Sequence, residues 1–394
     1  MVIKTFRLLI VLSFIFVGDF FAQDSLIKIG EVLSNHGFEN IRINTEASSL
    51  YISYENRLYR FEANALNNAT KLVVDVLHDY KEIYFIIVNR NIPLSVFKYD
   101  VDKKEFVDFI FDVDEYWDKV KKIEPINSSN LKFDLVIKPD FKGEFGDYSN
   151  PIQAQFNLLP EINTNISTGL NISYETIVPL YNEFTSLEDS VRPGIISLSQ
   201  FIRLPNSVFL LGSVGYFSNN RYGVDFEGKK YYTNGNYSFG INFGYTGYAQ
   251  LMFGRFYYSE PYLFTGNINT EYRIPEYDLT LGITGGKFLY KDMSLRFDVN
   301  RQFGEIEIGF FAIYSEGGNY NGGFNFVIPL FPSKHLKPNI VRIKTSENYR
   351  WEYRVRGLIP GQRGRSYKTG NSINSLLERT NPSFIKNYLQ KYIN

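Results

Sequence analysis

The second half of the chain alternates between apolar and polar positions with a period of two. In YSFGINFGYTG, residues 237–247, every second position is large and apolar, and Ser, Gly, Asn and Thr stand between. That period is typical of a β-strand with two chemically different faces. About twelve such segments follow one another from 152 to 331, separated by short turns such as SNN, TNGN and EGGN. The pattern predicts a large antiparallel sheet.

The length of the segments and the small residues on one face favour a membrane barrel. Each segment with its turn has about 15 residues, close to the ~9–11 that a tilted membrane strand needs plus a turn. A soluble sandwich, the alternative, would present a charged face to water, whereas Gly, Asn, Ser and Thr suit a lumen. We therefore expect an outer-membrane antiparallel β-barrel of about 12 strands. Phe239, Ile241 and Phe243 would face lipid, and Asn242 would face the lumen.

The regions on either side of 152–331 have a different character. Residues 25–136 read as helix, hairpin, helix and hairpin, which predicts a small α/β domain. Residues 137–151, including FKGEFGDYSNP, read as a linker, and 332–394 read as a basic tail that is weakly helical at its end. The predicted fold is thus mainly β, with the barrel preceded by a small periplasmic α/β domain and followed by a periplasmic tail.

The first residues indicate secretion. Lys4 and Arg7 precede an apolar run from 8 to 17, and a plausible cleavage site follows Ala22. We interpret 1–22 as a signal peptide. Past Ala22 no run of 18 apolar residues occurs, so a membrane crossing would use strands.

The amino-acid composition limits the classes of partner and of chemistry that we expect. The chain has 42 basic and 42 acidic residues, so no bulk charge points to nucleic acid. It contains 30 Tyr and 35 Phe but no Cys, which excludes disulfides, thiolate chemistry and a lipid-anchoring cysteine. We expect outer-membrane lipid as a partner and no cofactor or metal.

Charged and amide residues on the polar strand faces are the candidate site. Carboxylate pairs such as Asp225 with Glu227 or Asp292 with Asp298 have the chemistry for glycoside cleavage, but a salt-bridged lumen network is the favoured interpretation. A histidine-based site is disfavoured, since His36, His78 and His335 lie outside the alternating region. The predicted lumen residues are Arg221, Asp225, Glu227, Asn242, Arg255, Asp292, Arg296 and Asp298.

The basic tail offers a second candidate. Its arginines alternate with aromatic residues, which can stack on sugars and pair with an anionic polymer or a lipid phosphate. The alternative is a solvated tail beside the membrane. The residues concerned are Arg350, Trp351, Arg354 and Arg356.

Five stretches of the chain form an ordered series of motifs. They are HGFENIRINTEASSLYISYENRLYR, GLNISYETIVPLYN, LPNSVFLLGSVGYFSNNRYGVDFEGKKYY, YDLTLGITGGKFLYKDMSLRFDVNRQFGEIEIGFFAIYS and GGFNFVIPLFP. This series, over roughly residues 26–355, resembles the YjbH family of exopolysaccharide biosynthesis proteins. Two departures are that the chain lacks a lipoprotein cysteine and is shorter than the larger members.

The resemblance implies a function that the pattern alone does not. It implies a non-enzymatic role in the biosynthesis, assembly or export of an exopolysaccharide or capsule, with the polymer or other secretion components as partners. Two rivals stay open: a general outer-membrane porin, and a lipid- or glycan-modifying outer-membrane enzyme.

Overall fold

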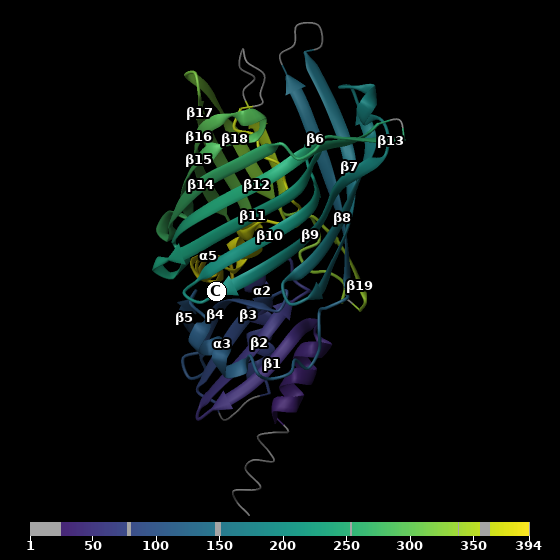
Figure 1. The fold of residues 1–394 in the computed structure, drawn as a ribbon. Helices are drawn as coiled ribbons and strands as arrows, with labels where there is room; N and C mark the ends of the chain where they lie inside the picture. Colours follow the sequence, from purple (N-terminus) through teal and green to yellow (C-terminus); the bar gives the residue numbers. More distant parts are fainter. Residues whose placement is uncertain are drawn as a thin grey trace, which may run out of the picture.

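Two sheets make up most of the molecule in the computed structural model. A five-stranded sheet lies at one end, and a fifteen-stranded sheet rises from it (Figure 1). We call the part built on the small sheet the module and the other part the large sheet. The structure describes residues 25–76, 80–145, 151–252, 254–337, 339–354 and 363–393.

The module follows the predicted order of helix, hairpin, helix and hairpin. A helix at 25–35 precedes the first hairpin, and the sheet order is β1-β2-β3-β4-β5. In α2 one face is buried through Ala65, Leu66, Ala69 and Val73, which is the helical spacing that an amphipathic helix needs. The elements are β1 Phe38–Glu46, β2 Ser49–Asn56, α2 Glu62–Val74, β3 Glu82–Asn89, β4 Ile92–Asp100, β5 Glu105–Ile110 and α3 Asp114–Val120.

The large sheet holds long antiparallel strands. Short 3-10 turns interrupt some connections, at Ser186–Glu188, Thr233–Gly235, Pro275–Tyr277 and Leu289–Lys291. The strands are β6 Phe133–Phe145, β7 Ile152–Ser167, β8 Leu170–Asn182, β9 Arg192–Leu204, β10 Val208–Phe217, β11 Arg221–Tyr232, β12 Tyr237–Met252, β13 Arg255–Tyr258, β14 Leu263–Ile274, β15 Leu279–Lys287, β16 Met293–Phe303, β17 Ile306–Ser315, β18 Asn319–Ile328, β19 Val341–Thr345 and β20 Tyr349–Arg354.

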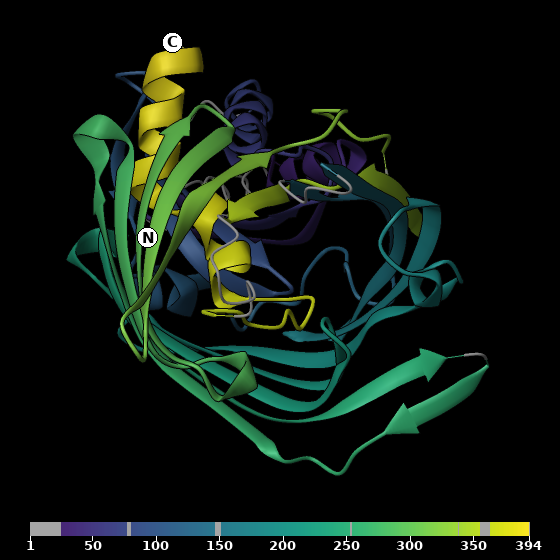
Figure 2. The ribbon, with the colours of Figure 1, turned by 90° about the horizontal axis from the view of Figure 1, so that it is seen from above.

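The large sheet curls so that its two edges approach each other (Figure 2). β19 pairs in parallel with β6, and β20, only a few residues later, pairs with β18 at the opposite edge. The end of the chain therefore changes partner across a seam. Rings bridge it: the centroids of Phe141 and Trp351 are 6.2 Å apart, and those of Phe145 and Tyr353 are 6.4 Å apart. Between β20 and β6 the described residues form no backbone ladder.

The two faces of the large sheet differ as the alternation predicts. On β12, Phe239 and Phe243 point outward and are 43% and 41% exposed, whereas Ser238 points inward and is 2% exposed. Ile241 is half-buried on the outward face. Outward apolar residues of this kind continue around the sheet, for example Ile172, Val214, Val224, Ile268, Ile283, Phe297, Ile308 and Phe310.

The sheet is larger than predicted, with fifteen strands rather than about twelve. Residues 137–145, predicted as linker, belong to β6, which pairs with β7 along its whole length. Lys138 and Asp140 point inward there and contact Glu161 and Asn157. Residues 133–136, assigned to the α/β domain, begin the same strand. The rest of the predicted linker, 146–150, lies outside the described residues. The charged positions suggested a linker, but they form the inner face of a strand.

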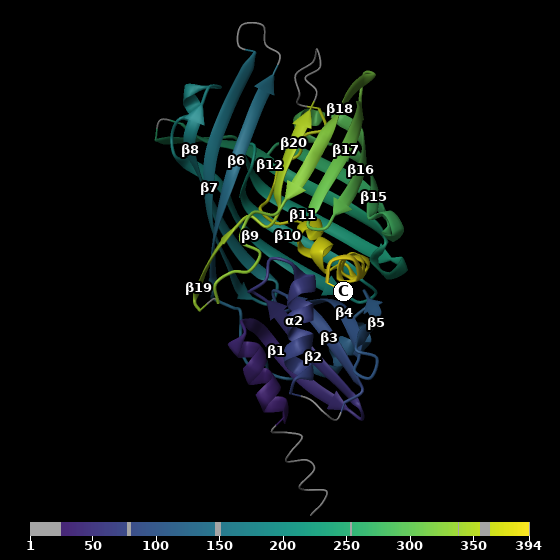
Figure 3. The same cartoon turned by 180° about the vertical axis from the view of Figure 1, so that it is seen from behind.

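The predicted tail is also largely wrong as a separate unit. β19 and β20 complete the large sheet, and the end of the chain packs between sheet and module (Figure 3). Phe384 and Ile385 are buried in the module core, where the Phe384 ring meets that of Phe61 at 5.1 Å. The last elements are α4 Ile373–Leu377, a 3-10 turn Glu378–Thr380, α5 Pro382–Tyr388 and a π-helical turn Leu389–Ile393.

Across the ranges that the structure describes, no helix combines the length and apolarity needed to span a membrane.

Candidate functional site

The space enclosed by the large sheet, which we call the lumen, is occupied by part of the C-terminal chain. Residues 363–374, which we call the inner segment, run inside the ring of strands (Figure 2). At the end far from the module, the Gly364 amide donates to Asp292 Oδ2 at 2.6 Å, and Arg363 donates to the Glu316 carbonyl at 2.9 Å. The inner segment is thus fixed at its start.

Tyr367 anchors the middle of the inner segment. Its hydroxyl donates to Asp225 Oδ2 at 2.7 Å, and its ring stacks on Phe217 at 5.4 Å. Asn242 Nδ2 donates to the other oxygen of Asp225 at 3.0 Å. A Cβ at Gly244 would lie 1.6 Å from the Tyr367 hydroxyl, so only glycine fits there. Gly244 in the alternating pattern therefore makes room for this tyrosine.

The lower end of the inner segment is fixed by charges on the strands. The Ile373 amide donates to Glu227 Oε2 at 2.9 Å. Lys229 donates to both Asn374 Oδ1 and Glu271 Oε2 at 2.6 Å, and Asn374 donates back to Glu271 at 2.9 Å. Each of these sheet residues faces inward, so the inner segment replaces water as their partner.

The inner segment divides the lumen into two cavities, of 1240 and 1060 Å³. We call them the upper cavity and the junction cavity. The upper cavity lies among β11–β16, β6 and β20, while the junction cavity reaches the module. Arg365, Ser366, Tyr367 and Lys368 line both, as do strand residues such as Asn242 and Asn267, so the inner segment lies where the two cavities adjoin.

A charged network lines the upper cavity. Arg296 holds Asp298 with its Nε and terminal nitrogen, at 2.7–3.0 Å, and also donates to Glu352 at 3.0 Å. Arg354 contacts the other oxygen of Glu352. The carboxylates considered for glycoside cleavage are therefore engaged, Asp298 by arginine and Asp225 and Glu227 by the inner segment.

The predicted lumen residues fall on the inner face with one exception. Arg255 lies in β13, a short exposed strand that pairs only with β12 beyond the ring, so its assignment to the lumen is wrong. Strand alternation alone does not reveal where a strand leaves the ring. The inward or buried residues are Arg221, Asp225, Glu227, Asn242, Asp292, Arg296 and Asp298.

The four tail residues predicted as one contact surface are split. Arg350 and Arg354 point into the lumen, where Arg350 donates to Glu307 at 3.3 Å. Trp351 lies on the other face of β20, with its ring 5.3 Å from that of Phe326. Successive strand residues point to opposite faces, so an interleaved run divides when it forms a strand. Arg356 lies outside the described residues.

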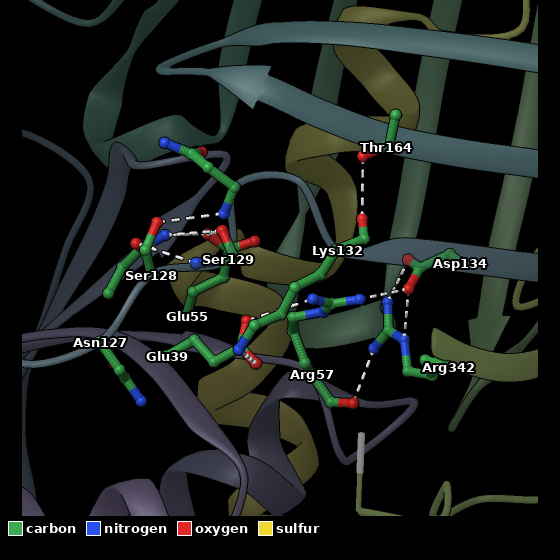
Figure 4. Close-up of polar contacts among 12 residues, drawn as sticks. Glu39, Glu55, Arg57, Asn127, Ser128, Ser129, Lys132, Asp134, Thr164 and Arg342 are labelled. Carbon is green, nitrogen blue, oxygen red and sulfur yellow. Dashed lines mark hydrogen bonds and ion pairs between the residues drawn. The ribbon is translucent and has the colours of Figure 1, made fainter. Parts of the chain in front are cut away.

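A buried ion-pair network joins the module to the large sheet (Figure 4). Arg57, just after β2, donates to Glu39 Oε2 at 3.2 Å and to Asp134 Oδ1 at 2.6 Å. Arg342 on β19 donates to Asp134 Oδ1 at 2.9 Å and to the Arg57 carbonyl at 2.8 Å. Lys132 reaches Glu39 at 2.7 Å. The network fixes β6 and β19 against the module, where the seam begins.

No pattern in the sequence marks the inner segment or this junction. Tyr367, Asn371 and Asn374 stand in SYKTGNSIN, which has no period and has the small polar composition of a surface loop. Their partners are more than 100 residues away, as with Tyr367 and Asp225.

Histidine and metal chemistry find no support among the described residues. No group of three or more His, Cys, Asp or Glu side chains there is arranged to hold a metal ion. His335 is buried near Glu347, with 3.6 Å between Nε2 and Oε1, and His36 is bonded to the Val32 carbonyl of its own helix. His78 lies outside the described residues.

Glu62 in the junction cavity should make stability depend on pH. Burial raises the pKa of Glu62 to about 8, and Asn56 Nδ2 donates to it at 3.2 Å. The folded chain keeps this proton where the unfolded chain loses it, so stability should fall as pH rises from about 4.5 to 8, by at most ~1.4 kcal/mol per pH unit. Glu62→Gln should flatten that fall in melting temperatures measured in detergent. The exposed Glu115→Gln should leave it unchanged, and an equal effect of both changes would contradict the assignment.

Comparison with known proteins identifies the family. No curated protein matches the sequence. Among solved structures, a loop-deletion mutant of OmpT, an outer membrane protein of Vibrio cholerae, aligns with 50% of this chain and 85% of its own at 9% identity. The TM-score of this alignment is 0.26, too low to indicate a shared fold. The family described as exopolysaccharide biosynthesis protein YbjH matches residues 23–345. The chain therefore belongs to the YjbH family of exopolysaccharide biosynthesis proteins.

Proposed function

We propose that the protein is an outer-membrane β-barrel whose lumen takes part in the assembly or export of an exopolysaccharide, without catalysing a reaction. The single observation that carries the proposal is the division of the large sheet into two faces. Outward positions are apolar or aromatic and exposed, while inward positions are charged, amide or small. Lipid suits the first face and a hydrated polymer suits the second.

The position of the module favours one orientation. Bacterial barrels have short turns on the periplasmic side, and the segments before and after the barrel meet there. Here the module and the C-terminal α5 form one core at a single end of the large sheet. We place that end in the periplasm, where the module is available to other secretion components. This orientation also agrees with a signal peptide at 1–22.

The lumen supports a passage with a removable obstacle better than a constantly open pore. A general porin needs a continuous aqueous channel, whereas the inner segment separates two cavities here. Against an enzyme stands the engagement of the candidate carboxylates, since Asp298 is held by Arg296 and Asp225 by Tyr367 and Asn242. A glycosidase needs one free acid and one free base.

Deletion of the gene tests the proposal. We expect the surface polysaccharide to be lost, as followed by a polysaccharide stain, with small-solute permeability unchanged. Restoration by the Asp225→Asn and Asp298→Asn variants would agree with a non-catalytic role. Unchanged polysaccharide with reduced solute uptake would instead indicate a porin. Turnover of lipid or glycan that is lost in either variant would indicate an enzyme.

A further inference from the structure

The junction cavity contains an arginine that forms no ion pair among the described residues, although the Glu55 carboxylate acts on it electrostatically. Arg90 lies in the turn between β3 and β4 and is 6% exposed. One terminal nitrogen donates to Asn371 Oδ1 at 2.6 Å, while its other terminal nitrogen, NH1, has no hydrogen-bond partner among the described residues. Burial lowers the pKa of Arg90 to about 10. A buried guanidinium is costly unless an anion or acceptor meets it, and this one lines a cavity of 1060 Å³.

The turn that carries Arg90 is held in place against the large sheet. Arg90 and Asn91 both have left-handed backbone angles, with φ of 53° and 61°, as a two-residue hairpin turn requires. The Arg90 carbonyl accepts from the Gly169 amide at 2.9 Å, and Asn91 Nδ2 donates to Thr168 at 3.0 Å. The guanidinium is thus presented to the lumen by a fixed backbone.

A second cation on the inner segment lines the same cavity. The Lys368 amide donates to Ser218 Oγ at 2.7 Å, and its carbonyl accepts from the Ser218 amide at 3.0 Å. Its ammonium group makes no ion pair with any carboxylate in the described part of the chain. Lys368 stands three residues before Asn371, the partner of Arg90, so the two Cα atoms of the segment are at most about 11 Å apart.

Two carboxylates that line the same cavity accept hydrogen bonds from neutral groups, and others are paired with cations, as Asp134 is with Arg342 and Glu161 is with Lys138. Glu55 accepts from Asn40 Nδ2 at 2.6 Å and from Ser129 at 3.1 Å, and Asp140 accepts from Asn157 at 2.9 Å. Burial also raises the pKa of Glu55. Among the described lining residues the Arg90 guanidinium therefore has a free donor, while Glu55 and Asp140 are occupied acceptors. Glu62, whose Oε1 has no partner, has its pKa raised to about 8 by burial.

We propose that the junction cavity binds an anionic sugar unit of the polymer, carrying a carboxylate or a phosphate, through Arg90 and Lys368. This inference rests on the proposed function, because it names the class of polymer that enters the lumen. The lining of the same cavity includes Asn163, Thr164 and Asn165 of β7, and amide and hydroxyl side chains are suited to sugar hydroxyl groups. Charge-assisted hydrogen bonds from guanidinium and ammonium supply the selectivity for an acidic unit.

Binding to the purified full-length protein in detergent tests the proposal. Three probes are compared by calorimetry: an oligogalacturonate, a glycerol-phosphate oligomer and a neutral dextran oligomer. At least one acidic probe should bind, more weakly as salt increases, and the dextran should bind at least tenfold more weakly. The oligogalacturonate carries carboxylates and the glycerol-phosphate oligomer carries phosphates, so comparing their binding shows which anionic group the site prefers. Equal binding of all three probes, or binding of none, would overturn the proposal.

Variants locate the binding. Lys368→Gln should weaken the acidic probe about tenfold or more, because a charge-assisted contact is lost while the backbone bonds to Ser218 remain. Arg90→Gln should weaken the acidic probe to the same extent. Because Arg90 is buried and its variant could misfold, the Lys368 variant, whose melting temperature should be unchanged, decides whether a lost cation alone weakens binding. Lys71→Gln, on the exposed side of α2, is the matched control. If Lys71→Gln weakens binding as much as Lys368→Gln, the site is wrong. Absent binding with export that still depends on the gene would overturn this inference and leave the proposed function standing.

Discussion

Phe243→Lys should prevent the protein from assembling in the outer membrane, whereas Asn242→Lys should be tolerated. Phe243 is 41% exposed on the outward face, where it stacks on Phe264 at 6.2 Å between ring centroids. A lysine on the lipid face costs about 2–4 kcal/mol near the middle of the membrane. At position 242 the side chain points inward beside Asp225, and a lysine there can form an ion pair with that carboxylate.

The amount of heat-modifiable protein in the outer-membrane fraction measures this difference. The two variants add the same charge at adjacent positions of one strand, so expression and net charge are matched. Equal assembly of both, or failure of Asn242→Lys alone, would show that the faces are assigned the wrong way round or that lipid does not meet the outward face.

Replacement of Arg365, Ser366, Tyr367 and Lys368 by glycine should open the lumen. These residues lie where the two cavities adjoin, and glycine removes the Tyr367 ring with its stacking on Phe217 and its bond to Asp225. The upper and junction cavities would then merge into one path. In planar bilayers the variant should show conductance steps several times larger than those of the unchanged protein, and cells should become more permeable to small solutes.

Tyr367→Phe is the matched control for this change. It removes only the hydroxyl bond to Asp225 and leaves the ring on Phe217, so conductance should stay near that of the unchanged protein. The idea that the inner segment obstructs the lumen fails if the glycine variant assembles normally and conducts no better than this control.

The faces of the strands were predictable because they depend on neighbours in sequence. In β12 the alternation of Phe239, Phe243 and Tyr245 with Ser238 and Thr246 is a local property, and the structure keeps it. The same holds for the module, where helical spacing in α2 marks the buried face. The departures arose where charged residues occur in a strand, as in β6 and β20, since an ion pair in the lumen makes a charge compatible with strand structure.

The contacts between the module and the large sheet, and the place of the inner segment, were not predictable, because they depend on partners far apart in sequence. Asp134 and Arg342 are 208 residues apart, and Arg90 and Asn371 are 281 apart. The polar groups of a loop can form hydrogen bonds with water as well as with Glu227 or Asp225. Composition therefore does not distinguish a solvated tail from a segment inside a lumen. The inner segment fits inside the lumen because residues such as Gly244 leave room for its side chains.

A photo-crosslinking residue placed at 242 or at 243 tests the passage of polymer through the lumen most directly. Asn242 lines both cavities and Phe243 points outward, so the two probes sample opposite sides of one strand. In cells that are making the polysaccharide, benzoyl-phenylalanine at 242 should be captured by the polymer, and the same probe at 243 should be captured by lipid. Polymer attached through 243 but not 242, or no polymer at either position while export continues, would contradict the account.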